Sequence, residues 1–454
     1  MTPRTWSPDS WRRFEAHQQP VYRDGQALQR VTHDLAQLPP LVTSFEVERL
    51  RELLAEAQEG RRFLLQAGDC AERVEDCRAE PIAARLKILL QMSLVLTHGL
   101  RQPVIRVGRF AGQYAKPRSQ ASETRVVDGA SLTLPSYLGD LINRPEFTAE
   151  AREPRPERLL EGYSHAALTL NFVRALVEGG FTDWHEVERW DLPFLHAAAL
   201  TGPRRAQYET IKQGVASARD LQAMAEGGAE HFYASHEGLH LEYERAQTRN
   251  VPHRRGHYCL TTHLPWIGDR TRALDGAHVE FFRGIQNPVG VKLGPSATAA
   301  DVRDLAQRLN PADTPGRLVF ITRVGAHHVE RLLPDWIEAV RDRRVLWVCD
   351  PMHGNTTRTP AGIKTRSFEA IAEEFERTLD IHNTCASHLG GLHVEVTADD
   401  VTECIGGAAG PEENGLEARY ETACDPRLNY KQSLELSFRL AGHLAGRSGI
   451  PARD

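Results

Sequence analysis

The strongest constraint on the fold of this chain is an alternation, from Phe63 onward, of short apolar runs with longer segments of helical periodicity. Each run is followed by polar residues and then by a segment with apolar residues at helical spacing, such as SFEAIAEEFERTLDIHN. This order indicates strands that pair in parallel and are connected by helices. The candidate strands are residues 63–67, 104–108, 184–188, 231–234, 290–293, 318–322, 345–349 and 392–396.

Eight runs of this kind predict an α/β fold of the (β/α)8, or TIM barrel, type. A doubly wound open sheet is the alternative. The first strand is not followed by the GxGxxG pattern of dinucleotide-binding sheets, and its absence favours the barrel. Residues 1–60 read as helices and turns and form a predicted N-terminal helical extension. The barrel is predicted to occupy residues 61–454, with extra helices inserted around residues 194–230.

Composition and charge exclude several other classes of protein. Hydrophobic residues make up 41% of the chain and charged residues 26%, as in ordinary globular proteins. The net charge is −6 and no basic tail is present, so we expect no nucleic-acid partner. The first twenty residues hold no apolar segment of the signal-peptide kind, and the apolar segment 86–100 is too short to span a membrane. We therefore expect a cytoplasmic protein.

Four potential metal ligands lie at or beyond the ends of different predicted strands. Because active sites of this fold form where the strands end, these side chains are expected to converge. One thiolate, one imidazole and two carboxylates suit a divalent ion such as Mn²⁺, Fe²⁺, Co²⁺ or Zn²⁺. The residues have no CxxC or HExxH spacing, so a buried core thiol and an ordinary loop histidine remain alternative interpretations. The four are Cys70, His353, Glu395 and Asp425.

Six cationic side chains follow the same strand ends without matching acids. Guanidinium and ammonium groups bind phosphates and carboxylates, so this set predicts a site for phosphorylated, anionic substrates. For the segment 266–295, the alternative to a substrate site is a surface helix with several salt bridges, followed by a core strand. The six are Arg109, Lys116, Arg118, Arg270, Lys292 and Arg323.

Ten motifs, in this order, resemble those of class II 3-deoxy-D-arabino-heptulosonate 7-phosphate (DAHP) synthases: LLQAGDCAE, GQYAKPRS, YASHE, WIGDRTRALDGAH, NPVGVKLGP, ITRVGAHHV, CDPMHGNT, GGLHVEVT, TECIGG and RYETACDPRLN. The resemblance covers about residues 40–440. It implies a (β/α)8 barrel that condenses phosphoenolpyruvate with D-erythrose 4-phosphate and water. The products would be DAHP and phosphate, in the first step of the shikimate pathway of aromatic amino acid biosynthesis.

The resemblance also implies roles for individual residues. The family's metal ligands fall on Cys70, His353, Glu395 and Asp425, the four named above. Its phosphoenolpyruvate contacts fall on Arg109, Arg270, Lys292 and Arg323. Its erythrose 4-phosphate contacts fall on Lys116, Pro117, Arg118 and Ser119. The expected cofactor is one divalent metal ion, Mn²⁺, Co²⁺ or Fe²⁺, with Zn²⁺ as a further candidate.

Two catalytic residues are predicted within the segment 266–295. Lys292 is the candidate for protonating the developing alkoxide, because an ammonium among cations has a lowered pKa. Charge neutralisation is its alternative role. Asp269 stands where the family's WIGERTR motif has glutamate, an acid thought to position or activate the attacking water. Its side chain is shorter by one methylene, about 1.5 Å.

Several alternatives remain open on the sequence alone. The loop after Ser119, QASETRVVDGASLTLPSYLGD, is longer than usual in the family. Together with Asp269, this loop keeps open the alternative that the protein is a paralogue of secondary metabolism. Such a paralogue would take an altered aldose phosphate, for example an amino aldose phosphate. A non-catalytic regulatory partner is a second alternative. Cys424 adjoins Asp425 and is therefore expected near Cys70. Oxidation of the two thiols to a disulfide is a hypothesis, and its alternative is that Cys424 is a buried thiol without a role. We further expect a homo-oligomer, a dimer or tetramer, with aromatic amino acids as candidate effectors.

Overall fold

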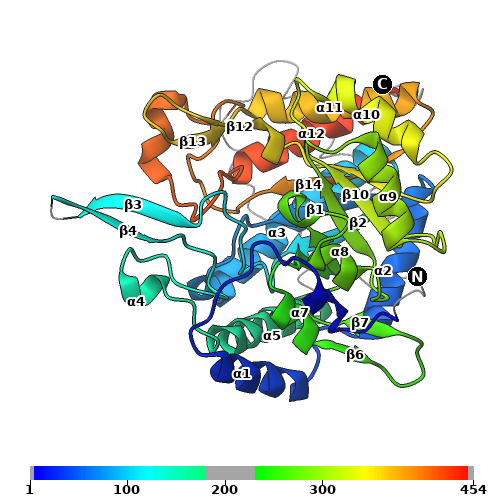
Figure 1. The fold of residues 1–454 in the computed structure, drawn as a ribbon. Helices are drawn as coiled ribbons and strands as arrows, with labels where there is room; N and C mark the ends of the chain where they lie inside the picture. The colour runs from blue at the N-terminus through cyan, green and yellow to red at the C-terminus, as the bar shows by residue number, and fades with distance from the viewer. Residues whose placement is uncertain (1–4, 128, 180–230, 409, 448–454) are drawn as a thin grey trace.

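A computed structural model describes residues 5–127, 129–179, 231–408 and 410–447 of the chain (Figure 1). Its centre is a closed barrel of eight parallel strands, which confirms the predicted (β/α)8 architecture. Around the barrel the strand order is β1, β14, β11, β10, β9, β8, β5 and β2. Their bounds are β1 Phe63–Gly68, β2 Val104–Arg109, β5 Tyr233–Glu237, β8 Leu264–Ile267, β9 Val289–Leu293, β10 Leu318–Thr322, β11 Leu346–Cys349 and β14 Leu389–Glu395.

The predicted strand at residues 184–188 lies outside the described residues. Among the described strands, β2 pairs directly with β5 through Val107 and Tyr233, and the closed barrel includes β8, which the sequence analysis missed. The other seven predicted runs coincide with barrel strands to within a few residues. The helices predicted around residues 194–230 also lie outside the described part of the chain.

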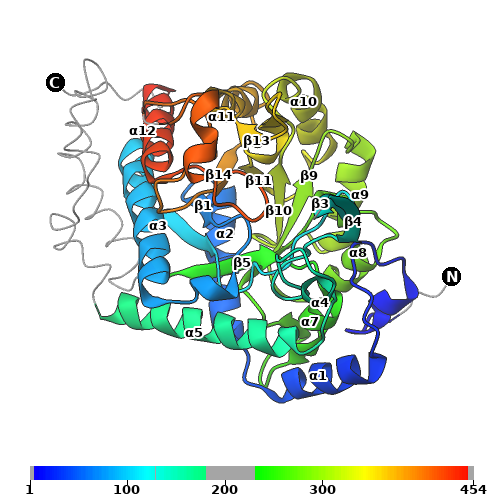
Figure 2. The ribbon, with the colours of Figure 1, turned by 90° about the vertical axis from the view of Figure 1, so that its left-hand side faces the viewer.

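Helices surround the barrel, as Figure 2 shows. The long helices α3 and α12 lie side by side on its outer surface, and α11 lies next to α12. Helix α9 begins at a capping box in which Thr298 and Asp301 bind each other's backbone N–H groups, which explains its sharp start. The bounds are α3 Ala79–Leu100, α5 Arg158–Glu178, α8 Ala277–Phe282, α9 Ala299–Leu309, α10 Val329–Ala339, α11 Phe368–Thr384 and α12 Tyr430–Arg447.

Helix α2 of the N-terminal segment covers the end of the barrel where the strands begin. The segment contains η1 (Ser10–Arg13), α1 (Gly25–Gln37) and α2 (Ser44–Gln58). Apolar side chains of α2, among them Leu50 and Leu54, are fully buried in one cluster with residues of the barrel strands. Helix α1 packs against α5 and against α7 (Leu241–Ala246).

Shorter elements occupy the loops of the barrel. The hairpin of β3 (Ser122–Val127) and β4 (Ala130–Pro135) projects from the body of the protein (Figure 1) and is the loop after Ser119. The others are β6 Thr248–Asn250, β7 His257–Cys259, β12 Thr356–Arg358, β13 Lys364–Arg366, α4 Ala149–Arg152, η2 Val74–Asp76, η5 Asp269–Thr271, η6 His353–Asn355 and η7 Glu413–Arg419. Among the described helices, none combines the length and apolar character that a membrane span requires.

Candidate active site

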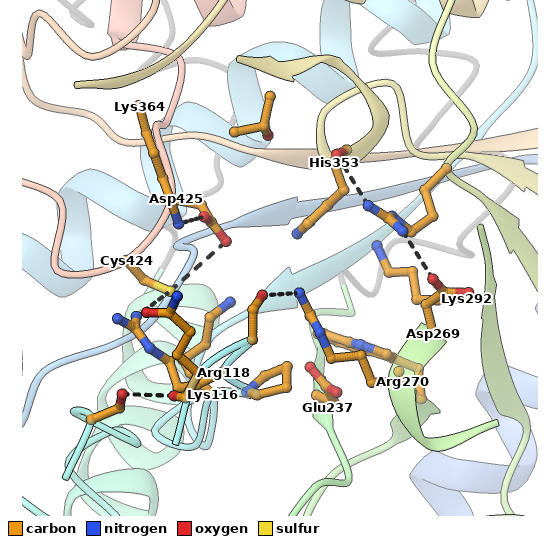
Figure 3. A pocket seen from close by; sticks show the side chains of 18 of the residues that line it. Lys116, Arg118, Glu237, Asp269, Arg270, Lys292, His353, Lys364, Cys424 and Asp425 are labelled. Atoms are coloured by element: carbon orange, nitrogen blue, oxygen red, sulfur yellow. Dashed lines mark hydrogen bonds and ion pairs between the residues drawn. The ribbon is translucent and has the colours of Figure 1, made fainter. Parts of the chain in front are cut away.

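A cavity of about 380 Å³ opens where the barrel strands end (Figure 3). It is lined by all eight residues assigned to the two substrates and by Asp269, His353 and Asp425. Cys70 and Glu395 are fully buried next to it. The structure therefore brings together every site residue predicted from the sequence.

The four predicted metal ligands lie in two overlapping groups that share Asp425. They come from the loops after β1 and β11, from β14 and from the segment before α12. The Nε2 atom of His353 lies 3.2 Å from Oε1 of Glu395. Ligand atoms of these two residues and of Asp425 all lie within 4.8 Å of one another. The Sγ atom of Cys70 is 3.9 Å from Oδ2 of Asp425. Sulfur, nitrogen and two carboxylates at this spacing fit one divalent ion.

The charge state of this cluster also suits a cation. Burial disfavours the charged form of Glu395, but His353, Arg366 and Arg109 outweigh it and hold its pKa well below the usual value. Burial acts on Asp425 in the same direction and is again outweighed, so its pKa also lies below the usual value. Both carboxylates are thus ionised at neutral pH.

The four residues assigned to phosphoenolpyruvate lie around the inner part of the cavity. Arg109 is almost fully buried, donates to Oε1 of Glu395 at 2.8 Å and lies over the ring of Trp266. Arg323 donates from Nη2 to the backbone oxygen of His353 at 3.1 Å. Arg270 donates to Oγ of Ser119 at 2.8 Å, which joins the two predicted substrate sets.

Lys292 is buried at the end of β9, and its ammonium contacts the carboxylate of Asp350. Burial lowers the pKa of Lys292 to about 8, and Arg109 adds to the effect, while Asp350 opposes it. The pKa of Lys292 is therefore lowered, as predicted, although desolvation contributes more to the decrease than the neighbouring cations do. A proton on this group is exchangeable near neutral pH.

The KPRS segment, residues 116–119, forms the opposite wall. Lys116 is buried, and the thiols of Cys70 and Cys424 help to raise its pKa above the usual value against the effect of burial. Arg118 donates to Oε1 of Glu123 at 3.0 Å, and Glu123 belongs to β3. Figure 3 shows Lys116 and Arg118 on the side of Cys424 and Asp425, across the cavity from Lys292 and Asp269.

Asp269 is bound on both carboxylate oxygens. Oδ1 accepts from the backbone N–H of Gly294 at 2.8 Å and from Nε of Arg272 at 3.0 Å. Oδ2 accepts from Nη1 of Arg323 at 3.0 Å. Asp269 therefore orients one of the cations assigned to phosphoenolpyruvate. A Cβ atom at Gly294 would collide with Oδ2, so the glycine is needed for this close approach.

Several residues that line the pocket were not assigned a role from the sequence, among them Glu237, Lys364 and Arg358. Oε1 of Glu237, at the end of β5, is buried without a hydrogen-bond partner in the described structure, and burial raises the pKa of this carboxyl. Lys364, on β13, donates to Oδ1 of Asp425 at 3.0 Å, and Arg358 lines the same side. The position of Glu237 at a strand end was a usable signal. The two hairpin residues carried no such signal.

The thiols of Cys70 and Cys424 approach each other as expected from the sequence. Together with a carboxylate oxygen of Asp425, their sulfur atoms form a group within 4.8 Å. Burial raises the pKa of Cys70, and the interaction with Cys70 lowers that of Cys424. Both cysteines are free in the structure. Their oxidation to a disulfide stays a prediction.

Comparison with known proteins identifies the family. The sequence model of the class-II DAHP synthetase family matches residues 6–441. A phospho-2-dehydro-3-deoxyheptonate aldolase of Neurospora crassa is 44% identical over 464 residues, 96% of this chain and 94% of the relative. A protein of the same name from Streptomyces coelicolor is 46% identical over 441 residues, which are 95% of this chain and 96% of the relative. A solved structure of phospho-2-dehydro-3-deoxyheptonate aldolase from Francisella tularensis is similar with a TM-score of 0.45 and 15% identity, over 92% of this chain and 97% of that one. By its match over residues 6–441 and these two relatives, the chain belongs to the class-II DAHP synthetase family.

Proposed function

We propose that this enzyme condenses phosphoenolpyruvate with erythrose 4-phosphate and water, giving DAHP and phosphate. This is the first step of the shikimate pathway. The observation that carries the proposal is that both predicted sets of substrate residues line one cavity, next to the cluster of metal ligands. The two sets are Arg109, Arg270, Lys292 and Arg323 for phosphoenolpyruvate, and Lys116, Pro117, Arg118 and Ser119 for erythrose 4-phosphate.

The cations of the first set hold the phosphate and carboxylate of phosphoenolpyruvate, so that its C3 atom faces the aldehyde carbon. Positioning of this kind supplies roughly 7–11 kcal/mol of barrier reduction in favourable cases. Arg323 is suited to it because Asp269 and the backbone oxygen of His353 hold its guanidinium in place. The second set binds the aldose phosphate, and the contact of Arg270 with Ser119 joins the two sites.

Cys70, His353, Glu395 and Asp425 would hold one divalent ion, with Mn²⁺, Co²⁺ and Fe²⁺ as first candidates and Zn²⁺ as a further one. When bound, the ion supplies Lewis acidity to the aldehyde oxygen. Lys364 restrains Asp425 through Oδ1, and Arg366 restrains Glu395 through Oε2 at 2.7 Å. These contacts orient the two carboxylates before any ion binds.

Lys292 accounts for one proton transfer of the reaction. C3 of phosphoenolpyruvate attacks the aldehyde carbon, and water adds at C2 with release of one proton. The resulting phosphohemiketal expels phosphate by cleavage of its C–O bond, and the proton of its C2 hydroxyl goes to the departing phosphate. Lys292, with its pKa lowered to about 8, donates the proton that the new alkoxide needs. We assign Asp269 the orientation of Arg323, because both of its oxygens are bound by the protein. Glu237, with an oxygen free of partners among the described residues, is better placed to contact the attacking water.

Two alternatives from the sequence are not favoured. Identities of 44% and 46% to curated relatives over nearly their whole lengths favour the ordinary reaction over an altered acceptor or a non-catalytic partner. A homo-oligomer, a dimer or tetramer, and control by aromatic amino acids remain expectations. So does the division of the chain into an extension, residues 1–60, and a catalytic barrel.

The test is an assay of phosphoenolpyruvate consumption with Mn²⁺ or Co²⁺, with and without erythrose 4-phosphate. We expect consumption only when both are present, together with DAHP formation. Turnover only with a different aldose phosphate would refute the proposed acceptor. Absence of turnover with any aldose would favour a non-catalytic role.

A further inference from the structure

Glu374 is a buried carboxyl group that belongs to neither set of substrate residues and is not one of the predicted metal ligands. Glu374, on α11, is fully buried. Its Oε1 atom accepts hydrogen bonds from the backbone N–H groups of Val324 and Gly325 at 3.0 and 2.8 Å. Its Oε2 atom accepts from Nδ2 of Asn355 at 2.7 Å. Glu374 thus connects the loop after β10 with the loop after β11.

The amide of Asn355 completes this connection. Its Oδ1 atom accepts from the backbone N–H of Ala326 at 3.2 Å, and its Nδ2 atom also donates to the backbone oxygen of Pro351 at 2.8 Å. The orientation of the amide is therefore fixed, with nitrogen toward Glu374. The loops also touch through their backbones, because a Cβ atom on Gly354 would collide with the nitrogen of Gly325.

No cation among the described residues lies within ion-pair distance of Glu374; its partners are two backbone amides and one side-chain amide. A buried carboxylate is costly unless its hydrogen bonds are satisfied. A purely apolar packing role would be filled at lower cost by a leucine or methionine. The arrangement therefore points to a role for the hydrogen bonds themselves.

The two loops carry groups of the proposed site. Val324 directly follows Arg323, so the bond to its N–H fixes the peptide plane that leaves Arg323. His353 lies two residues before Asn355 and accepts from Arg323 at 3.1 Å through its backbone oxygen. Through its hydrogen bonds to the two loops, Glu374 consequently helps to fix the position of Arg323 relative to His353.

The same device occurs elsewhere in the barrel. Glu72 is also buried, and its two oxygens accept from the backbone N–H groups of Ala111, Gly112 and Gln113 at 2.9–3.0 Å. That loop leads into the KPRS segment. Glu72 has the Arg85 guanidinium at 3.9 Å, whereas Glu374 depends on neutral donors alone.

We propose that Glu374 is a positioning residue for phosphoenolpyruvate: by joining the loops after β10 and β11 it holds Arg323 in register with His353, without touching substrate. The inference rests on the proposed function, because it needs phosphoenolpyruvate to bind at Arg323. It predicts that loss of the bridge weakens phosphoenolpyruvate binding more than it slows turnover or weakens aldose binding.

The first variant is E374Q. Its amide oxygen can still accept from Val324 and Gly325, but its amide nitrogen meets the donor nitrogen of Asn355. A flip of Asn355 would lose the bonds to Ala326 and Pro351. We expect the Kd of phosphoenolpyruvate, measured by calorimetry on the purified protein loaded with Mn²⁺, to rise about 10- to 100-fold, by analogy with the effect of residues that orient metal ligands. KM for phosphoenolpyruvate should rise in parallel, with kcat and KM for erythrose 4-phosphate changing less than threefold.

The matched control is E369Q. Glu369 lies on the same helix α11, is 60% exposed and pairs with Arg439 of α12, so the same chemical change is made away from the loops. Its affinity for phosphoenolpyruvate should equal that of the wild type. Thermal unfolding of both variants verifies that each protein is folded.

N355A and the double variant E374Q/N355A complete the test. If both residues act through one bridge, the double variant binds phosphoenolpyruvate no more weakly than the worse single variant. Additive losses, or an E374Q protein with less active enzyme but unchanged affinity, would overturn the inference. A wild-type protein that does not bind phosphoenolpyruvate would overturn the proposed function as well, so the two failures are distinguishable.

Discussion

Replacement of Asp269 by asparagine separates orientation of Arg323 from activation of water. In D269N the remaining side-chain oxygen can keep the N–H of Gly294 and Nε of Arg272, whereas the new amide nitrogen faces the Arg323 guanidinium. The lost bond is charge-assisted, a type that contributes about 1.5–3 kcal/mol. The side chains of Asp269 and Arg323 are 20% and 23% exposed, so the lower value applies, which corresponds to about tenfold weaker binding of phosphoenolpyruvate.

The assay is titration of wild-type and D269N protein with phosphoenolpyruvate, followed by steady-state kinetics. D304N, a change at an exposed position of α9, is the control and should bind like the wild type. If D269N keeps full affinity but loses turnover, Asp269 acts on the attacking water and our assignment is wrong. D269E tests the departure from the family's glutamate: unchanged affinity, rate and aldose preference would show that the shorter acid has no consequence.

Three other outcomes are expected. If the Lys292 ammonium donates a proton, kcat falls as pH rises through about 8, the value to which burial lowers its pKa, and a flat profile between about pH 7 and pH 9 contradicts this role. Mild oxidation joins Cys70 to Cys424 in a disulfide and lowers both the metal content and the activity of the wild type. C424S keeps its metal and activity after the same treatment, and retained metal in the oxidised wild type would refute the idea. L50A, in the helix that closes the other end of the barrel, lowers the free energy of unfolding by about 2–5 kcal/mol. Its affinity for phosphoenolpyruvate should stay unchanged, since a loss would show that the two ends are coupled.

The barrel was largely predictable because its strands are buried on both faces and read as continuous apolar runs. The missed strand, β8, has only four residues, LPWI, and contains Pro265, which normally argues against a strand. In the structure it pairs with β5 through Leu264 and Trp266, and with β9 through Trp266 and Ile267. Its short length and its proline concealed it from a search for periodicity.

The site residues were predictable because a parallel barrel brings strand ends together, whatever their separation in sequence. Their mutual contacts were not. Whether Asp269 faces water or Arg323 depends on the path of the chain through Gly294, which periodicity does not reveal. Glu374 was hidden for another reason: it lies in the charged run EEFER, which is typical of a solvent-exposed helix surface, although its own side chain is fully buried.

The most direct test of the central claim is the stoichiometry of the reaction at this cavity. Purified protein, stripped of metal with a chelator and then supplied with Mn²⁺, is mixed with phosphoenolpyruvate and erythrose 4-phosphate, and all products are quantified. We predict one DAHP and one phosphate for each phosphoenolpyruvate consumed, no turnover before the metal is added, and near-complete loss of turnover in K292A. Phosphate release without DAHP, or undiminished DAHP formation by K292A, would contradict the proposed function of this site.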